Sequence, residues 1–176
     1  TLTTSSAASD VYKRQVKNVQ QNVGLCEVNG FNRLEITGAD CHAFLDRMIC
    51  GNVTKRDGRV GLGYLLNHYG MIKSEATVAN LSASDRGPAR VWYGSAAASE
   101  THDLEWLTTH VRDDEDVHIK SLTNDQTILV LAGPKARDVL SACARGDWSQ
   151  KAFPWLSVCE AFVGFAPSTV LAVSFS

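Results

Sequence analysis

The chain has 176 residues, of which 44% are hydrophobic and 20% charged, and its formal net charge is -2. This is the composition of a globular domain or of a piece of one. The 17 basic residues nearly balance the 19 acidic ones, so no basic field gathers nucleic acid. The longest apolar runs fall short of the roughly 20 residues that a membrane helix requires. We therefore expect neither nucleic acid nor a membrane as a partner.

The two ends of the chain differ from its middle. Residues 1–15, TLTTSSAASDVYKRQ, are rich in Ser, Thr and Ala and lack the apolar stretch of a secretory signal. We interpret them as a non-native or disordered leader that does not pack. The other end, STVLAVSFS, stops inside a predicted strand, which indicates truncation at the C-terminus. Residues 16–176 are then the N-terminal part of an incomplete domain.

Strand and helix patterns alternate between these ends. A pair of short strands is predicted around the Asn29-Gly30 turn, within residues 23–38. Asp40 can cap a helix over 39–52, where Phe44 and Leu45 share a face. Further strands are predicted within 59–67, 71–81, 89–94, 116–122, 126–133, 157–163 and 169–175, and further helices within 99–111 and 134–144, the last with Pro134 at its first position.

The order of these elements predicts an α+β fold, in which helices pack on antiparallel sheets. Two stretches, LEITGADCHAFL and LVLAGPKARDVL, share the plan of a strand, a glycine and a helix. Gly38 then corresponds to Gly133, and Leu45 to Leu140. This correspondence suggests two related halves, ferredoxin-like or β-rich, although strand-glycine-helix junctions also recur in unrelated folds.

The five cysteines are odd in number, and none forms a Cys-x-x-Cys pair. This usage is typical of a reducing compartment and predicts buried structural thiols rather than metal ligands. Other motifs are absent as well. The chain has no Gly-x-Ser-x-Gly elbow, and its glycines do not form a dinucleotide-binding Gly-x-Gly-x-x-Gly after a strand. We predict no metal site.

The stretch NHYGMIKSEATVANL, residues 67–81, carries the candidate chemistry. Alternation along a strand puts Lys73, Glu75 and Thr77 on one face, opposite Ser74. A solvent-facing strand would explain these polar residues without any function. The alternative is a ligand cavity beside the strand, lined by a partly desolvated Glu75 that accepts a proton from an amine.

Several stretches in this order resemble the aminomethyltransferase family. They are VGLCEVNGFNRLEITGADCHAFLDRM, GRVGLGYLLNHYGMIKSEATVANL, SAAASETHDLEWL, ILVLAGPKARDVL and FPWLS. The family includes the glycine-cleavage T-protein and the folate domain of dimethylglycine and sarcosine dehydrogenases. The resemblance covers residues 16–176 and implies a tetrahydrofolate-binding, one-carbon transfer domain.

The family motif of glycine, isoleucine and carboxylate matches Gly70, Ile72 and Glu75. The resemblance thus implies that Glu75 is the catalytic carboxylate beside the folate amines. Leu62, Ala79 and Ala96 match positions of the folate pocket where the T-protein tends to carry other residues. These differences favour the dehydrogenase-linked branch, which AFPWLS also supports.

In that branch, FAD belongs to an upstream domain absent from this chain, and the reactants are folate and an N-methyl amine. Two alternatives stay open. One is a stand-alone aminomethyltransferase that uses an aminomethyl donor, and the other is a non-catalytic folate-binding module of the same fold. The resemblance implies a bacterial cytoplasmic or mitochondrial matrix location, without secretion.

Overall fold

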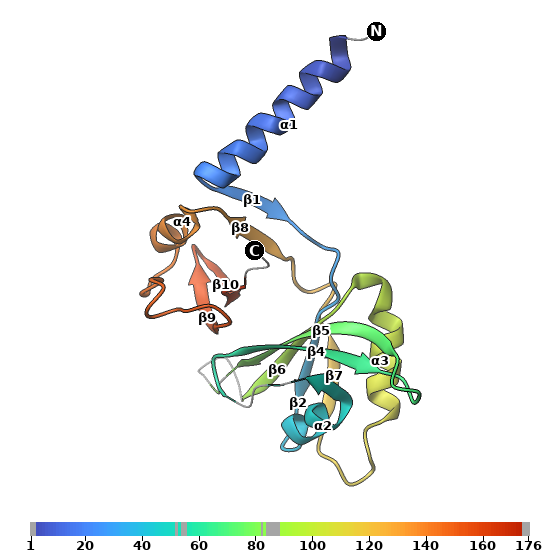
Figure 1. Cartoon of the computed structure of the whole chain (residues 1–176). Coiled ribbons are helices and arrows are strands. Elements are labelled where there is room, and N and C mark those ends of the chain that lie inside the picture. The colour runs from blue at the N-terminus through green and yellow to red at the C-terminus, as the bar shows by residue number, and fades with distance from the viewer. Residues whose placement is uncertain (1–2, 52, 54–55, 82, 84–88, 174–176) are drawn as a thin grey trace.

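A computed structural model describes residues 3–51, 53, 56–81, 83 and 89–173 of the chain (Figure 1). Its helices are α1 (Thr3–Gln21), α2 (Cys41–Met48), the short 3-10 helix η1 (Ala97–Ser99), α3 (Glu100–Thr109) and α4 (Ala136–Cys143). Its strands are β1 (Gly24–Glu27), β2 (Leu34–Thr37), β3 (Ile49–Gly51), β4 (Val60–Leu66), β5 (Ile72–Leu81), β6 (Arg90–Gly94), β7 (His118–Ser121), β8 (Leu129–Ala132), β9 (Val158–Val163) and β10 (Ala166–Leu171).

Six of these strands form one antiparallel sheet in the order β3-β4-β5-β6-β2-β7. Helices α2 and α3 cover one face of this sheet (Figure 1). Phe44 and Leu45 of α2 and Leu107 of α3 are fully buried there against strand residues such as Leu65 and Val78. Each such side chain contributes about 1.5–3 kcal/mol by leaving water. The core therefore lies between the helices and one face of the sheet.

The remaining strands form two antiparallel pairs, β1 with β8 and β9 with β10. A small cluster built on Ala144, Trp148 and Phe153 packs between α4 and the β9–β10 hairpin. The prediction of an α+β fold with antiparallel sheets is confirmed. The structure does not establish ferredoxin-like halves.

Arg33 lies where the chain passes between these two parts. Its backbone N–H donates to Thr123 Oγ1 at 3.0 Å, and its Nη1 donates to the Thr123 carbonyl at 2.9 Å. Its Nη2 donates to Asn29 Oδ1 at 2.8 Å. The side chain is 2% exposed. One buried guanidinium thus ties together the two segments that connect the six-stranded sheet to β1 and β8.

The predicted β4–β5 hairpin is confirmed, with its turn between Leu66 and Ile72. The two short strands predicted around the Asn29-Gly30 turn do not pair with each other. Strands β1 and β2 both form, but β1 pairs with β8, and β2 lies between β6 and β7. Pairing partners distant in the sequence decided this outcome, and local turn propensity could not reveal them.

Helix α1 differs from the predicted unstructured leader, because the structure has a continuous helix from Thr3 to Gln21. Its side chains from Ser9 onward are exposed, apart from a half-buried Val19. The helix projects away from the sheets (Figure 1). The interpretation of residues 1–15 as a leader stays a prediction.

The two matched glycines occupy equivalent positions in the structure. Gly38 has a φ of 111° and Gly133 a φ of 114°, and each joins a strand to a helix. A Cβ on Gly38 would lie 2.0 Å from the Asp116 carbonyl oxygen, and one on Gly133 would lie 2.5 Å from that of Val19. Only glycine fits such a left-handed, closely packed turn. The relationship between two halves nevertheless stays a hypothesis.

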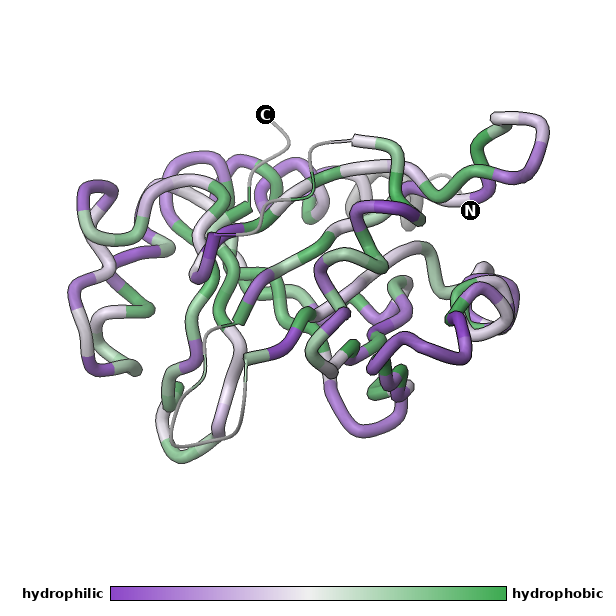
Figure 2. The backbone as a smooth tube through the Cα atoms, turned by 90° about the horizontal axis from the view of Figure 1, so that it is seen from below, coloured by the Kyte–Doolittle hydropathy of each residue, from purple (hydrophilic) through white to green (hydrophobic). Residues whose placement is uncertain are grey.

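Hydropathy along the chain agrees with this architecture. Figure 2 shows short hydrophobic stretches separated by hydrophilic ones. Within the described residues, no helix is both long and apolar enough to cross a membrane.

All five cysteines are free thiols. Cys41 is buried, Cys159 is half-buried, and Cys26, Cys50 and Cys143 are exposed. The expectation of buried thiols is therefore right for Cys41 and wrong for the three exposed ones, because residue-type averages do not fix which face of an element a cysteine occupies. Burial raises the pKa values of both the Cys41 and Cys159 thiols.

Candidate functional site

The face of the six-stranded sheet opposite α2 and α3 holds the candidate site. On this face, Leu62 lies across from Thr77, and Tyr64 lies across from Glu75. The row formed by Leu62 and Thr77 continues onto β6, where Gly94 pairs with Thr77. Leu62 is 40% exposed and Tyr64 is 43% exposed. We call this surface the open face and define it by Phe31, Leu62, Tyr64, Glu75 and Thr77.

Phe31 joins the open face through an isolated bridge to Ala96. The β5–β6 pairs end at Thr77 and Gly94, and the same register continued by two residues would bring Ala96 across from Glu75. One row therefore runs from Tyr64 through Glu75 and Ala96 to Phe31. Neighbouring strands in a sheet lie about 4.8 Å apart, so this row spans about 14 Å. Ala96 is exposed, and Phe31 is 43% exposed.

Glu75 projects from β5 into open solvent. Among the described residues, none forms a hydrogen bond or an ion pair with its carboxylate. Neither of the two cavities described below includes it. The sequence predicted a partly desolvated carboxylate beside a cavity, and for this chain alone that expectation is wrong. The carboxylate instead lies on a surface, across from the exposed Tyr64 and diagonal to the exposed Leu62.

A β-bulge separates Lys73 from Glu75. Leu65 pairs with Ser74 and Leu66 pairs with Ile72, so Lys73 has no partner on β4. The extra residue turns Lys73 toward α3, where its Nζ lies 4.5 Å from the centre of the Trp106 ring. The prediction that Lys73 shares a face with Glu75 is therefore wrong. Strict alternation fails at a bulge, which inserts one residue into one strand.

The far end of the open face is closed by the β9–β10 hairpin. Val60 and Ala79, which pair across β4 and β5, pack there against Val158. Ala79 is fully buried, so the structure does not present its side chain to a ligand. Leu62 and Ala96, in contrast, are exposed. The sequence-derived site residues thus fall into a surface group of Leu62, Glu75 and Ala96 and a buried Ala79.

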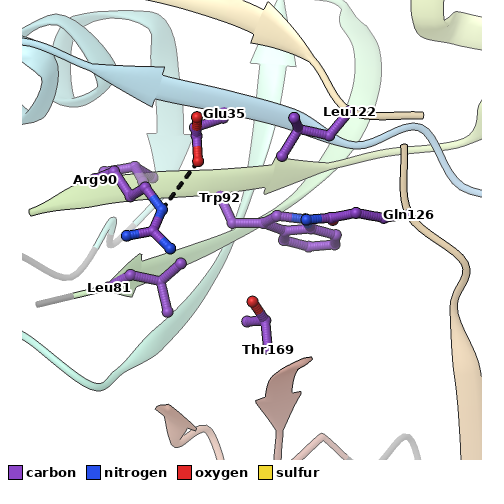
Figure 3. A pocket seen from close by; sticks show the side chains of 8 residues that line it. Glu35, Leu81, Arg90, Trp92, Leu122, Gln126 and Thr169 are labelled. Carbon is purple, nitrogen blue, oxygen red and sulfur yellow. Dashed lines mark ion pairs between the residues drawn. The ribbon is translucent and has the colours of Figure 1, made fainter. Parts of the chain in front are cut away.

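Trp92 forms a boundary between the open and closed parts of this face. Its indole lies against Gly94, where an added Cβ would come within 2.5 Å of the ring. A cavity of about 20 Å³ adjoins Trp92 and has room for about one water molecule. Glu35 and Arg90 line it and form an ion pair at 2.9 Å, drawn in Figure 3. Arg90 also forms an ion pair with Glu160 of β9. This cavity is too small for a folate ring.

A larger groove lies near the tip of the β4–β5 hairpin. It has a volume of about 450 Å³ and is bordered by α2, by α3 and by the end of β4. Trp106 contacts the imidazoles of His68 and His110 there, with ring centres 4.8 and 4.3 Å away. His110 Nδ1 donates a hydrogen bond to the backbone carbonyl of Trp106 at 2.7 Å. Asn67 and His68 of the hairpin turn line this groove, and none of the predicted site residues does.

The covered face, directly behind Glu75, contains a buried polar network centred on Asp103 of α3. Asp103 is 1% exposed and accepts hydrogen bonds from Ser74 Oγ at 3.1 Å and from the Tyr93 hydroxyl at 3.0 Å. Ser95 donates a third. Burial, together with the charge of Asp103, raises the pKa of Tyr93 above its ordinary value. The Tyr93 hydroxyl therefore stays protonated and donates.

Within the described residues, no group of three or more His, Cys, Asp or Glu side chains could hold a metal ion. Sequence reasoning missed Tyr64 and Phe31, which flank the row that contains Glu75. Tyr64 could have been found, because it follows Leu62 by two residues on the same predicted strand. Phe31 could not, because its pairing with Ala96 joins segments far apart in the chain.

Comparison with known proteins decides the family. The family model described as "GCVT N-terminal domain" matches residues 3–176. The chain belongs to this family. Dimethylglycine dehydrogenase of Rattus norvegicus, a mitochondrial protein, is 30% identical over 163 residues, which cover 92% of this chain and 18% of the relative. Sarcosine oxidase subunit alpha of Rhizobium meliloti is 33% identical over 167 residues, 93% of this chain and 17% of that subunit.

The fold of this GCVT N-terminal domain also agrees with a solved relative. The crystal structure of glycine cleavage system aminomethyltransferase T from Bartonella henselae superimposes with a TM-score of 0.72 at 17% identity. The match covers 90% of this chain and 40% of that protein. The chain therefore spans less than a fifth of the two sequence relatives and under half of the structural one. The resemblance to the aminomethyltransferase family found in the sequence is confirmed.

Proposed function

We propose that this chain is the folate-facing part of a one-carbon transfer domain, with Glu75 as the general base or positioning carboxylate. The observation that carries the proposal is the setting of Glu75. It is an exposed carboxylate without a partner among the described residues, in one row with the exposed rings of Tyr64 and Phe31. An acid between aromatic side chains suits a flat ligand that carries amines.

We propose that a reduced folate lies along the open face. On the continued β5–β6 register, the row from Tyr64 to Phe31 crosses four neighbouring chain segments and is about 14 Å long. Leu62 and Tyr64 would contact the planar part of the ligand, and Ala96 leaves room for it opposite Glu75. Ala79, which packs against Val158 of β9, would lie at the end of the site and would not touch the ligand. Tetrahydrofolate, when bound, supplies the amine nitrogens that take up a one-carbon unit.

Glu75 would hold such an amine by a charge-assisted hydrogen bond and accept its proton as the new carbon-nitrogen bond forms. A solvent-exposed carboxylate is a weak base for this purpose, so the site also requires a cover that excludes water. We propose that another part of a longer protein supplies this cover, because the two sequence relatives are more than five times as long as the matched segment.

The names of the two sequence relatives favour an N-methyl amine as the source of the carbon. We therefore propose a dimethylglycine or sarcosine dehydrogenase-like protein in which FAD belongs to another domain. A mitochondrial matrix or bacterial cytoplasmic location accords with those relatives. Bound flavin in the purified full-length protein, together with an upstream dinucleotide-binding motif, would support this branch. Their absence would favour a stand-alone aminomethyltransferase.

The test is Glu75→Gln in the full-length protein that carries this chain. With dimethylglycine or sarcosine and tetrahydrofolate, we expect methylenetetrahydrofolate formation to fall by about 10²-fold, the usual loss for a general base. Glu105→Gln is the matched control, since Glu105 is an exposed glutamate on α3, behind the sheet. Equal rates in the Glu75 variant and the parent would overturn the proposal, and folate binding alone would then indicate a non-catalytic module.

A further inference from the structure

Two consecutive residues of β5 contact α3 immediately before Glu75. Lys73 Nζ lies over the Trp106 ring and 3.3 Å from His102 Nδ1. The next residue, Ser74, places its Oγ 3.1 Å from Asp103 Oδ1. Lys73 lacks a partner on β4, because the β-bulge falls at this point. The local path of β5 therefore depends on α3 where the strand ladder is interrupted.

Bulges often occur beside functional sites, where they change the direction of a side chain. In a regular strand, the ladder alone fixes the direction of each residue. Here the ladder resumes at the pair of Ser74 and Leu65. Ser74 is 7% exposed and points into the core, so its neighbour Glu75 must point to the open face. The hydroxyl of Ser74 is thus a side-chain contact next to Glu75 that holds this direction, together with the ladder pairs of Glu75 with Tyr64 and of Ala76 with Gly63.

Asp103 is an expensive residue for such a place. Burying a carboxylate costs free energy unless hydrogen bonds or a cation compensate. Among the described residues, no cation forms an ion pair with Asp103, and its compensation comes from the hydroxyls of Ser74, Tyr93 and Ser95. An apolar side chain of similar size is often at least as stabilising as a buried charge. What a carboxylate adds is a fixed geometry for several donors on two strands.

We propose that Asp103 is a positioning residue, which sets the direction of Glu75 on the open face by holding Ser74. This inference rests on the proposed function of Glu75. Asp103 itself is separated from the open face by the sheet and touches no ligand there. Catalytic groups must be held closely, and a displacement of about 1 Å can cost on the order of 10²-fold in rate.

The test removes one hydroxyl at a time from the same carboxylate. Ser74→Ala deletes the link from β5, whereas Ser95→Ala deletes another hydroxyl donor to Asp103 and leaves the Ser74 contacts with Asp103 and Tyr93 in place. We expect both variants to lose thermal stability, because each removes a buried hydrogen bond. Only Ser74→Ala should lower kcat for methylenetetrahydrofolate formation, by about 10-fold, with KM for tetrahydrofolate nearly unchanged. Ser74→Thr, which keeps the hydroxyl, should restore kcat.

A second variant protects the test from a folding failure. Asp103→Asn keeps the volume of the side chain but replaces one acceptor oxygen with a donor. It should therefore also lower kcat while KM for tetrahydrofolate stays nearly unchanged. Combining Ser74→Ala with Glu75→Gln separates this inference from the proposed function. If Ser74 acts through Glu75, the double variant should be no slower than Glu75→Gln alone.

The outcomes are distinct. A Glu75→Gln protein with parental rates would remove the proposed function, and this inference with it. A slow Glu75→Gln protein, combined with equal kcat values in Ser74→Ala and Ser95→Ala, would overturn the positioning role alone. Additive losses in the double variant would overturn it as well.

Discussion

The two faces of the six-stranded sheet use the same strands in opposite ways. On the covered face, Phe44 and Leu65 have no exposed surface and Asp103 is held by three hydroxyls. On the open face, Leu62 and Tyr64 are 40% and 43% exposed, and Glu75 has no partner among the described residues. The covered face can therefore account for stability, while the open face is free to carry chemistry. Residues one position apart on β5 serve these different purposes.

The largest expected difference between the faces is in stability. Phe44→Ala should lower the free energy of unfolding by about 3–5 kcal/mol, because it leaves a cavity between α2 and the sheet. Leu62→Ala should change it by no more than about 0.5 kcal/mol, because that side chain already meets water. Urea denaturation of both variants measures the contrast. A loss for Leu62→Ala close to that for Phe44→Ala would show that the open face is buried in solution.

A smaller effect is expected where the open face meets β9. Arg90 pairs with Glu35 on the sheet and with Glu160 on β9, and its side chain is 14% exposed. Arg90→Met keeps the length of the side chain but leaves two carboxylates without this cation. We expect a loss of about 1.5–3 kcal/mol, the range for hydrogen bonds to charged groups. A midpoint of urea unfolding that does not move would show that the ion pairs of Arg90 contribute no net stability.

The smallest expected effect concerns Glu115, which forms an ion pair with Arg47 of α2. The Arg112 backbone N–H and then the Arg47 guanidinium lower the pKa of Glu115 below its usual 4.5. A carboxyl whose pKa is lowered by folding stabilises the protein above its unfolded pKa, and this contribution is lost as the pH falls through the folded value. Glu115→Gln should therefore lower Tm modestly at pH 7.

The same variant provides its own control at acidic pH. Below the folded pKa, Glu115 is protonated in both states, so the parent and Glu115→Gln should have the same Tm. Thermal unfolding followed by circular dichroism at neutral and at strongly acidic pH gives both values. A Tm difference that stays constant across this range would contradict the assignment of the Glu115 contacts.

Much of the architecture could be predicted from local patterns. Periodicity found the β4–β5 hairpin and helices near α2 and α3, because a single buried face controls each of these elements. Local patterns failed where partners are distant. Strands β1 and β2 belong to different sheets because β1 pairs with β8, whereas β2 pairs with β6 and β7. No turn signal reveals these partners.

The candidate site was predictable in part for the same reason. Alternation placed Glu75 and Ser74 on opposite faces correctly, since both lie beyond the bulge. It misplaced Lys73, because nothing in NHYGMIKSEA marks where an extra residue enters the ladder. The burial of Ala79 could not be foreseen either, as it depends on Val158, a residue from the other part of the chain.

Arg33 has a mechanical consequence for the whole chain. The two crossings between the six-stranded sheet and the rest of the protein run through one place, and a single guanidinium fastens Asn29 on one crossing to Thr123 on the other. Twisting one part against the other would break these hydrogen bonds and leave a buried guanidinium without them. We therefore expect this connection to be rigid, so that the β9–β10 hairpin keeps its position over the end of the open face.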